Sequence, residues 1–330
     1  MADPGFKTTV IVPNYNGIDY LRKCIESLNR ARETHYFAVL VVDNGSDDGS
    51  LELARYFEQE GACKVLSFPE NRGFSAAVNA GVDMILTEYA LLLNNDTVIK
   101  KDFVYELEKF MDEHPDAFSV TSKMITMFDP DVLDGTGDFY TALGYAIARG
   151  KGKSTELYEE DDEVFSACAG AAIYRKGLIR SLGGFDENHF CYMEDVDIGY
   201  RALINGYKNY YCHSAEVFHA GSAASGSRYN KWKVELAARN NVYVAYKNMP
   251  LLQYLINLPL LIAGVIIKHI FFIRKKMGTA YMTGVIKGIG LCLSRDGRMN
   301  KVRFRLSNLG NYIKIQLKLW GNITKLLTKY

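Results

Sequence analysis

The sequence has few cysteines, and they show none of the spacings that build a cysteine site. Its six cysteines, among 330 residues, include no CxxC pair and no regular spacing. Zinc sites and disulfide frameworks both need such pairs, so neither is expected, and the thiols are predicted to stay reduced in the cytosol. The amino terminus lacks a basic stretch followed by a long apolar run, and no secretory signal is predicted.

Two common phosphate-binding motifs are also missing. The chain contains no GxGxxG and no GxxxxGK[ST]. In dinucleotide-binding and P-loop proteins these glycines let backbone N–H groups contact phosphates. Their absence counts against both classes.

Acidic residues are nearly missing from the last part of the chain. Residues 268–330 hold fourteen Lys or Arg and a single acid, Asp296, which leaves residues 1–267 at about −12, given the overall charge of +1. Basic segments favour polyanions, so this segment predicts contact with nucleic acid or with an anionic membrane surface.

What the sequence does contain is an alternation of strand and helix patterns. Apolar, β-branched runs predict strands, and apolar residues at helical spacing predict helices between them. This order predicts a mostly parallel sheet with helices on both faces, whose ligands bind at the carboxyl ends of the strands. The predicted strands are 8–13, 39–42, 65–66 and 90–93, and the helices are 20–31, 51–57 and the stretch ENRGFSAAVNAG.

The middle of the chain is less regular. A helix is predicted over 101–111, then irregular chain rich in Gly and Asp, and a charged surface loop over 148–163. Strand character returns in VFSACAGAAIY, residues 164–174, and a further helix is expected to begin near Glu194.

Polar side chains follow the predicted strands at their carboxyl ends, in 14–17, 43–46 and 94–96. The stretch LLLNNDTVI is the clearest case, because a buried strand ends in Asn94, Asn95 and Asp96. One carboxylate beside two amides suits a hard cation that also holds phosphate oxygens. An Asx turn or helix N-cap is the alternative interpretation of Asp96.

Two later motifs hold candidate acid–base groups. In MEDVDIGYRAL, Asp195 lies at a predicted loop-to-helix boundary and could act as a general base on a hydroxyl. The helix dipole alone favours Glu194 and Asp195 there, and Asp197 and Arg201 would form an ordinary surface ion pair. His219, in VFHAGSAASG, is available to a cation, although a structural role is the alternative.

Six stretches together resemble a known family. They are TTVIVPNYNG, VVDNGSDDGS, ENRGFSAAVNAG, LLLNNDTVI, GAAIYRKGLIRSLGGFDENHFCYMEDVDIGYRAL and VFHAGSAASG, and they occur in the order and spacing of the family 2 inverting glycosyltransferases of the GT-A fold. The rhamnosyltransferase-like branch is the most similar. The resemblance covers roughly residues 7–250 and implies a Rossmann-like catalytic domain that binds a nucleotide sugar.

The resemblance also places a donor pocket at the ends of the first strands. Pro13 and Tyr15 would line the nucleotide pocket, and Asp43 would accept a hydrogen bond from the pyrimidine ring. The other residues expected beside the donor are Asn16, Asn44, Asn71, Arg72, Asn94 and Asn95, with Arg239 near the leaving group.

A cation site and a base follow from the same resemblance. LLLNNDTVI occupies the place of the family's DxD motif, so Asp96 is expected to ligate Mg²⁺ or Mn²⁺ on the donor diphosphate, and His219 to complete the site as in some members. Glu194 and Asp195 match the ED motif, with Asp195 as the base. The chain departs from the family at Asn94, where a second aspartate is common. Weaker cation binding without the diphosphate is therefore expected.

The expected function is transfer of a sugar to a hydroxyl of a polyprenyl-diphosphate-linked saccharide, in the synthesis of a bacterial cell-surface polysaccharide. The best candidate donor is dTDP-L-rhamnose, and a UDP-hexose-dependent enzyme of the same fold is the alternative. A non-catalytic scaffold that binds glycans or membranes is the alternative outside the enzymes. The joint presence of Asp96, Asp195 and His219 counts against it.

The tail differs in kind from the rest of the chain. Residues 251–273 are apolar for long enough to span a membrane, which needs about 20 residues. They include Gln253, Asn257, Pro259 and Lys268, so a position in the membrane interface is favoured, as one or two helices with a break near Pro259. Residues 301–329 predict a basic amphipathic helix.

Two domains are therefore expected, a catalytic one at 1–250 and a membrane-associating helical tail at 251–330. The protein is predicted to be cytoplasmic and peripheral at the inner face of the cell membrane. Homodimerisation through the tail is the alternative. Nucleic acid is not expected as a partner, because the apolar content of 251–273 fits a membrane better.

Overall fold

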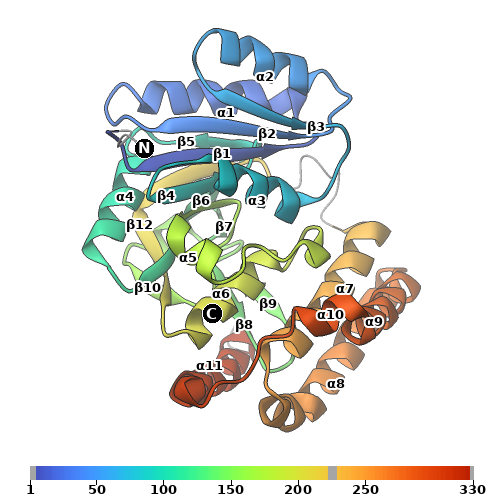
Figure 1. Ribbon diagram of the computed structural model, residues 1–330. Coiled ribbons are helices and arrows are strands. Elements are labelled where there is room, and N and C mark those ends of the chain that lie inside the picture. Colours follow the sequence, from blue (N-terminus) through green and yellow to red (C-terminus); the bar gives the residue numbers. More distant parts are fainter. Residues whose placement is uncertain (1–4, 222–228, 328–330) are drawn as a thin grey trace.

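The computed structural model describes residues 5–221 and 229–327, and one ten-stranded mixed sheet lies at its centre (Figure 1). The strand order is β10-β12-β6-β11-β4-β1-β2-β3, with β5 beside β12 and β7 beside β6. A separate two-stranded ribbon pairs β8 with β9. The predicted class, a mostly parallel α/β sheet covered on both faces, is confirmed.

The first half of the sheet is parallel, as the alternating pattern predicts. Its strands are β1 (Thr8–Asn14), β2 (Ala38–Asn44), β3 (Lys64–Phe68) and β4 (Tyr89–Leu93), and the helices between them are α1 (Ile18–Ala31), α2 (Ser50–Gln59) and α3 (Phe74–Met84). Val10 and Val12 point into the core under α1 and α2, and Ile11 points into the core under α3. Because β1, β2 and β4 run parallel, their polar carboxyl ends lie at one edge of the sheet.

The second half of the sheet mixes directions and was only partly predicted. After β5 (Thr97–Ile99) and α4 (Phe103–Glu113) come β6 (Ala117–Thr126), β7 (Leu133–Gly135), β8 (Asp138–Tyr140), β9 (Ala146–Ala148), the 3₁₀ turn η1 (Thr155–Leu157), β10 (Asp162–Val164) and β11 (Ala171–Arg175). The expectation of irregular chain after residue 111 is wrong, because β6 is a buried central strand. Its buried Ser119, Thr121, Ser122 and Lys123 gave it no apolar pattern. The strand expected over 164–174 is also wrong in its bounds, since β11 begins only at Ala171.

The helix that carries the ED motif is buried, not on the surface. The elements here are α5 (Lys176–Ser181), the 3₁₀ turn η2 (Glu187–His189), α6 (Glu194–Ile204), β12 (Lys208–His219) and α7 (Lys231–Asn248). Asp197 is 0% exposed, and its carboxylate accepts hydrogen bonds from Arg201 at 2.6 Å and from Lys247 of α7 at 2.8 Å. The predicted surface ion pair between Asp197 and Arg201 is therefore wrong in its location, because α7 packs over α6 and excludes water.

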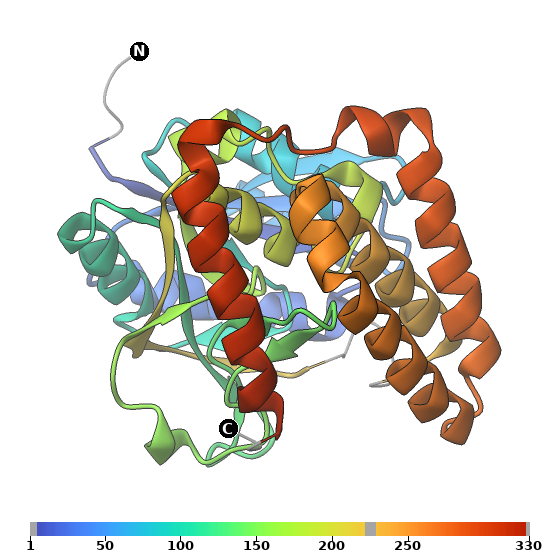
Figure 2. The same cartoon turned by 90° about the horizontal axis from the view of Figure 1, so that it is seen from below.

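The tail is helical and packs against the rest of the chain (Figure 2). Its elements are α8 (Leu251–Arg274), α9 (Gly278–Leu293), α10 (Arg295–Met299), the 3₁₀ turn η4 (Leu306–Asn308) and α11 (Leu309–Leu327). The break expected near Pro259 is wrong, since α8 runs through this exposed proline. The helix expected from residue 301 begins only at Leu309. α11 joins the catalytic part through hydrogen bonds from Ala142 N to Leu319 O, 3.1 Å, and from Asn322 Nδ2 to Tyr140 O, 2.9 Å.

The polarity of α8 is inverted relative to a helix of a soluble protein. Its buried residues include Gln253 and Asn257, and Asn257 exchanges two hydrogen bonds of 2.8 and 2.9 Å with Gln316 of α11. Most of its Leu and Ile side chains are exposed, and only 17% of its most apolar window is buried. Within the described residues, α8 is the one helix long and apolar enough to cross a membrane. An outward apolar face normally marks a contact surface.

A stability prediction follows from the buried charges between α6 and α7. Lys247 Nζ lies 2.7 Å from Asp186 and 2.8 Å from Asp197. Lys247→Met leaves both carboxylates short of a cation, and breaking a buried pair in this way costs about 3–5 kcal/mol. We expect the free energy of unfolding to fall by about that amount at pH 7, as measured by urea denaturation, while the exposed Lys109→Met changes it little.

The same variant has a defined pH dependence. Burial alone would raise the pKa of Asp197, but Arg201 and Lys247 hold that pKa well below its usual range. The stabilisation is present above the unfolded pKa of about 4 and is lost as the pH falls further. The difference in the free energy of unfolding between wild type and Lys247→Met should therefore become smaller in acid. Equal effects of Lys247→Met and Lys109→Met would contradict this account.

Candidate active site

The ends of β1 and β2 are joined by a network of polar side chains. Asp43 is fully buried, and its Oδ2 accepts hydrogen bonds from Asn14 Nδ2 at 2.8 Å and from Ser46 Oγ at 2.7 Å. Its Oδ1 accepts the backbone N–H of Ser46 at 3.1 Å. The Asp43 carboxylate, which is expected to bind the pyrimidine ring of the donor, therefore also fixes the conformation of the 43–46 turn.

The loop after β1 is fixed against that turn. Asn16 has a φ of 51°, and it accepts a hydrogen bond from the N–H of Asp47 at 3.0 Å. Tyr15 is 43% exposed, so its ring is available to a ligand, and Pro13 beside it is half-buried. The loop after β1 and the turn after β2 thus form one wall at the carboxyl edge of the sheet.

Asn44 connects this wall to the segment before α3. Its Oδ1 accepts the N–H of Arg72 at 2.9 Å, and its Nδ2 donates to Asn71 Oδ1 at 3.1 Å. The Arg72 side chain is exposed, and its guanidinium lies 3.9 Å from Glu187. The three donor-site candidates therefore lie together, with the Arg72 cation facing solvent.

The polar end of LLLNNDTVI forms a turn between β4 and β5. Asn95 Nδ2 donates to Asn14 Oδ1 at 2.7 Å, and Asn94 N donates to Gly170 O at 2.8 Å. Asp96 is 5% exposed, and its Oδ1 lies 3.1 Å from His219 Nε2. The amide of Asn95 is thus satisfied within the protein, whereas Asp96 turns toward a histidine from the far end of the domain.

His219 lies between two carboxylates. Its Nδ1 is 2.8 Å from Asp134 Oδ2, opposite the contact with Asp96. Burial alone would lower the pKa of His219, but the hydrogen bonds to Asp134 and Asp96 raise it to about 9. Asp134 orients the imidazole from its Nδ1 side, so a bound Mn²⁺ or Mg²⁺ would replace the Nε2 proton and be held by His219 Nε2 and the Asp96 carboxylate. Residues 222–226 of the VFHAGSAASG motif lie outside the described residues.

Asp195 lies at the first turn of α6, within reach of a second carboxylate. It is half-buried, and its carboxylate accepts N–H groups of Val196 at 2.8 Å and Ala169 at 3.3 Å. Ligating atoms of Asp138, Cys168 and Asp195 all lie within 4.8 Å of one another. Burial and the charge of Asp195 raise the pKa of Asp138 to about 8. Burial also raises the pKa of Asp195, so the two carboxylates titrate as a pair, and at neutral pH the pair holds one proton.

Glu194 differs from its neighbour in burial. It is 6% exposed, and its Oε2 has no hydrogen-bond partner among the described residues. Burial and the charge of Asp195 raise the pKa of Glu194 well above its usual value. A neutral, enclosed acid cannot take a proton, so of the two ED-motif residues Asp195 is the one suited to act as a base.

Arg239 lies in α7, which holds the segment before the ED motif. Its Nη1 donates to Asn240 Oδ1 at 2.9 Å. Asn240 Nδ2 in turn donates to the carbonyls of His189, Cys191 and Tyr192 at 2.8 to 2.9 Å. This side of α7 therefore fixes the loop that leads into Glu194 and Asp195.

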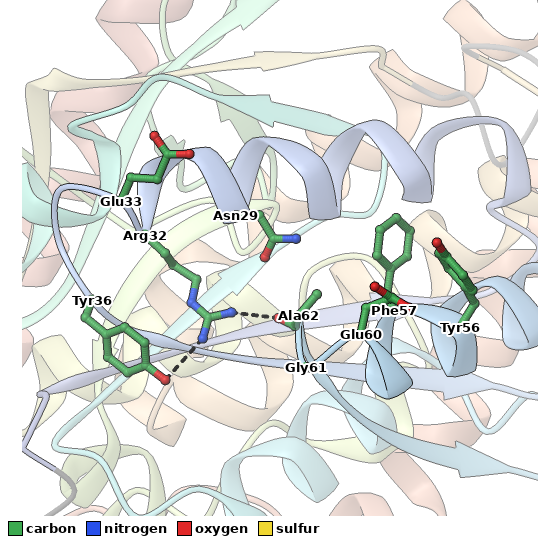
Figure 3. Close-up of a pocket in the computed structure, with 9 residues that line it drawn as sticks. All are labelled: Asn29, Arg32, Glu33, Tyr36, Tyr56, Phe57, Glu60, Gly61 and Ala62. Carbon is green, nitrogen blue, oxygen red and sulfur yellow. Dashed lines mark hydrogen bonds between the residues drawn. The ribbon is translucent and has the colours of Figure 1, made fainter.

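A hollow of about 570 Å³ lies elsewhere, between the carboxyl ends of α1 and α2 (Figure 3). Its Arg32 is bound to the carbonyl of Ala62 at 2.8 Å and to the hydroxyl of Tyr36 at 3.1 Å. The hollow is at the amino-terminal edge of the parallel strands, whereas ligands of such sheets bind at the carboxyl edge. It holds none of the candidate site residues.

Residues 9–183, just over half of the chain, match the sequence model of Glycosyl transferase family 2. The chain belongs to glycosyltransferase family 2. The resemblance seen in the six sequence motifs is thereby confirmed.

Two relatives of this glycosyltransferase are similar over most of their length. It is 25% identical to the rhamnosyltransferase WbbL of Escherichia coli K12 over 73% of this chain and 93% of WbbL. It is also 25% identical to the N-acetylglucosaminyl-diphospho-decaprenol L-rhamnosyltransferase of Mycobacterium tuberculosis, over 66% of this chain and 77% of that protein. The chain is 35% identical to glycosyltransferase GlyA of Streptococcus pneumoniae, but this match includes only 33% of this chain and 15% of GlyA.

Solved structures of similar fold support the GT-A assignment. GalNAc-T7, solved with UDP, GalNAc and Mn²⁺, has a TM-score of 0.61 at 13% identity, over 74% of this chain and 48% of that chain. Staphylococcus aureus TarS 1–349, solved with UDP, has a TM-score of 0.55 at 18% identity, over 98% of this chain and 92% of that chain. At these identities the likeness concerns the fold.

Asp134 and Asp138 are the candidate residues that the sequence analysis missed. Both lie in DGTGD, within the stretch expected to be irregular, and β7 and β8 bring them to His219 and Asp195. Two aspartates around glycines looked like a turn. The available signal was the apolar pair Val132–Leu133 before Asp134 and the aromatic pair Phe139–Tyr140 after Asp138.

The shared proton of Asp138 and Asp195 gives a testable pH dependence. The pKa of Asp138, about 8 when folded, is about 4 in an unfolded chain, so the native state binds the extra proton in between. Stability is therefore lost as the pH rises from about 4 to 8. Asp138→Asn removes this loss, so its gain in stability over wild type should be larger at pH 8 than at pH 5 in urea denaturation. Exposed Asp131→Asn is the control. A gain from Asp138→Asn that is equal at both pH values would rule out the raised pKa.

Proposed function

We propose that the protein transfers L-rhamnose from dTDP-L-rhamnose, with inversion, to a hydroxyl of a polyprenyl-diphosphate-linked saccharide. The observation that carries the proposal is a row of groups in which His219 contacts Asp96 and Asp134, and Asp138, four residues after Asp134, lies beside Asp195. Two rhamnosyltransferase relatives support the sugar, and one of them is named for a decaprenol-linked acceptor.

The chain's own residues supply the base. Asp195 is held by two backbone N–H groups and is partly open, so it can take the proton of an acceptor hydroxyl while that oxygen attacks the anomeric carbon. The bond from the anomeric carbon to the phosphate oxygen breaks in the same step, and the nucleoside diphosphate leaves. A single displacement inverts the anomeric configuration.

The residues at the other end of this row hold the donor. Asp96 and His219 would hold Mg²⁺ or Mn²⁺, which when bound offsets the charge of the donor diphosphate. The Asn44–Arg72 contact and the exposed Tyr15 lie where the nucleoside would sit. Arg239 is half-buried on α7 beside the loop that leads to Asp195, and its cation would favour the leaving diphosphate.

The tail supports a lipid-linked acceptor and a peripheral location on the cytoplasmic face of the membrane. The outward side chains of α8 form an apolar surface, and residues 268–330 of the tail include fourteen Lys or Arg. Leu251, Leu252, Leu255, Ile256, Ile270 and Phe271 are all at least 42% exposed. Apolar burial in the headgroup region and attraction to anionic lipids act together on such a surface, at about 1 kcal/mol per Lys or Arg near it. The division into domains at 250 and a homodimer through the tail stay predictions.

A UDP-hexose donor is the second candidate, because the fold neighbours GalNAc-T7 and TarS were solved with UDP. Release of nucleoside diphosphate from a panel of dTDP-L-rhamnose, UDP-glucose and UDP-N-acetylglucosamine separates the two. Release from none of them, in the presence of Mn²⁺ and membrane extract as acceptor, would favour the non-catalytic scaffold.

Asp195→Asn should lower transfer by about 10²- to 10⁴-fold, because the amide keeps the shape of the carboxylate and cannot take a proton. Donor affinity, measured by calorimetry, should change less than about twofold. The same assay with EDTA should lose activity, and Mn²⁺ should restore it. A loss below tenfold in Asp195→Asn would refute the base, and full activity after chelation would refute the cation site of Asp96 and His219.

Membrane association is tested by flotation with anionic liposomes. The full chain should float at low salt and less at high salt, because part of the attraction is electrostatic. Leu252→Glu, on the outward face of α8, should reduce flotation several-fold. Leu86→Glu, an exposed leucine of the catalytic part, is the matched control. A wild type that stays at the bottom of the gradient at low salt would refute membrane association and leave self-association as the use of this face.

A further inference from the structure

An apolar groove of about 310 Å³ lies between α7, α8 and α9. The turn that follows β8 also lines it, with Leu143, Gly144 and Tyr145. We call it the α7–α9 groove. Its walls are Ala238, Asn241, Val242 and Ala245 of α7, Tyr254, Leu258, Leu261, Ile262, Val265, Ile266 and Lys268 of α8, and Tyr281, Val285 and Ile289 of α9.

Two polar groups interrupt these apolar walls. Lys268 is half-buried, with Nζ 4.1 Å from the centre of the Tyr145 ring, and it makes no ion pair with a described residue. The Oδ1 of Asn241 is buried and accepts no hydrogen bond within the described part of the chain. A partly buried cation without a carboxylate favours an anionic ligand, since enclosing an unpaired charge is costly.

The groove opens onto the outward face of α8. Ile262, Ile266 and Ile289 line it and are still at least 50% exposed. A hydrocarbon chain can therefore pass from the groove to the apolar surface that faces the membrane in our proposed function, without crossing a polar rim.

The groove is also joined to the catalytic base. Asp138, beside Asp195, is five residues before Leu143, so their Cα atoms are at most about 18 Å apart. On the other side, Asn240 holds the loop that precedes Asp195, and the next residue, Asn241, lines the groove. A ligand with its chain in the groove would carry its polar end toward the site.

We propose that the α7–α9 groove binds the first isoprene units of a polyprenyl-diphosphate acceptor, with Lys268 beside the diphosphate. The inference rests on the proposed function and adds the place where the lipid is bound. The apolar walls suit a single branched hydrocarbon chain, and the one cation suits its diphosphate. The groove would then hold the acceptor in a fixed register, with its sugar hydroxyl at Asp195.

Binding of farnesyl diphosphate tests the groove without any turnover. It is a single prenyl chain with a diphosphate, and its affinity can be measured by calorimetry at a fixed concentration of a zwitterionic detergent. Ile266→Trp should narrow the groove and weaken binding at least tenfold. Ile267→Trp is the matched control, because Ile267 is equally exposed, at 54%, and does not line the groove. Both substitutions are at exposed positions, so the fold should be kept.

The charge is tested separately. Lys268→Gln should weaken farnesyl diphosphate about tenfold and leave farnesol binding within twofold, whereas Lys109→Gln, an exposed lysine of α4, should change neither. The proposal is overturned if the affinity for farnesyl diphosphate stays within twofold of wild type in all four variants, the two groove variants and their two controls. It is also overturned if dihexanoyl phosphatidylglycerol competes equally well, or if Ile266→Trp changes the oligomeric state and not the binding.

Failure of this inference is distinguishable from failure of the proposed function. If the variants change farnesyl diphosphate binding as described but no donor of the panel is turned over, the groove is supported and the proposed transfer fails. If transfer to lipid-linked acceptor proceeds at the wild-type rate in Ile266→Trp and Lys268→Gln, the groove is not the acceptor site and the transferase proposal stands.

Discussion

The buried ionic cluster around Asp197 is the interaction on which the arrangement of the molecule depends. Asp197 sits in the first turns of α6 and is bound by Arg201 of its own helix and by Lys247 and Asn248 of α7. Lys247 also holds Asp186, which accepts a hydrogen bond from Asn300 of the tail at 3.2 Å. A buried carboxylate needs these partners, because an unpaired charge in the interior is too costly to keep. Through this one cluster the position of α6, and so of Asp195, depends on α7 and on the tail.

This dependence explains why the tail is not a simple appendage. α7 begins after the last strand and packs against both α6 and α9, and α11 crosses under the catalytic part (Figure 2). Gln253 and Asn257 of α8 face inward, toward α6 and α11, and most of its Leu and Ile residues are exposed. An inverted helix of this kind is stable only if its outer face meets an apolar medium or another protein surface. In our proposals that medium is the membrane, and the site that needs a lipid-linked acceptor is fixed by the same helices that meet the lipid.

The sequence predicted the parts of the fold that show a simple period. The β-branched run of Val10, Ile11 and Val12, and the helices that follow each strand, were visible as patterns, and so was the edge where Asp43, Asn44 and Asp96 gather. It did not predict β6, whose buried Ser119 donates a hydrogen bond to Asn209 of β12 and whose buried Lys123 pairs with Glu159 and Glu216. A local pattern cannot distinguish a polar side chain that a distant partner will bury from one that solvent will cover. For the same reason the sequence analysis did not identify Asp134 and Asp138 as site residues and wrongly predicted Asp197 at the surface.

By itself the sequence determined the family and the chemical types at the site: a carboxylate after β4, an acidic pair at the start of α6 and a histidine at the end of β12. Those are properties of motifs, which short segments carry alone. Only the tertiary structure decided how these groups act. It set His219 between Asp96 and Asp134, brought Asp138 beside Asp195 so that the two carboxylates share a proton, and enclosed Glu194 so that it stays neutral. Protonation and ligand geometry depend on burial and on distances between residues far apart in the chain, and these exist only once the sheet has formed.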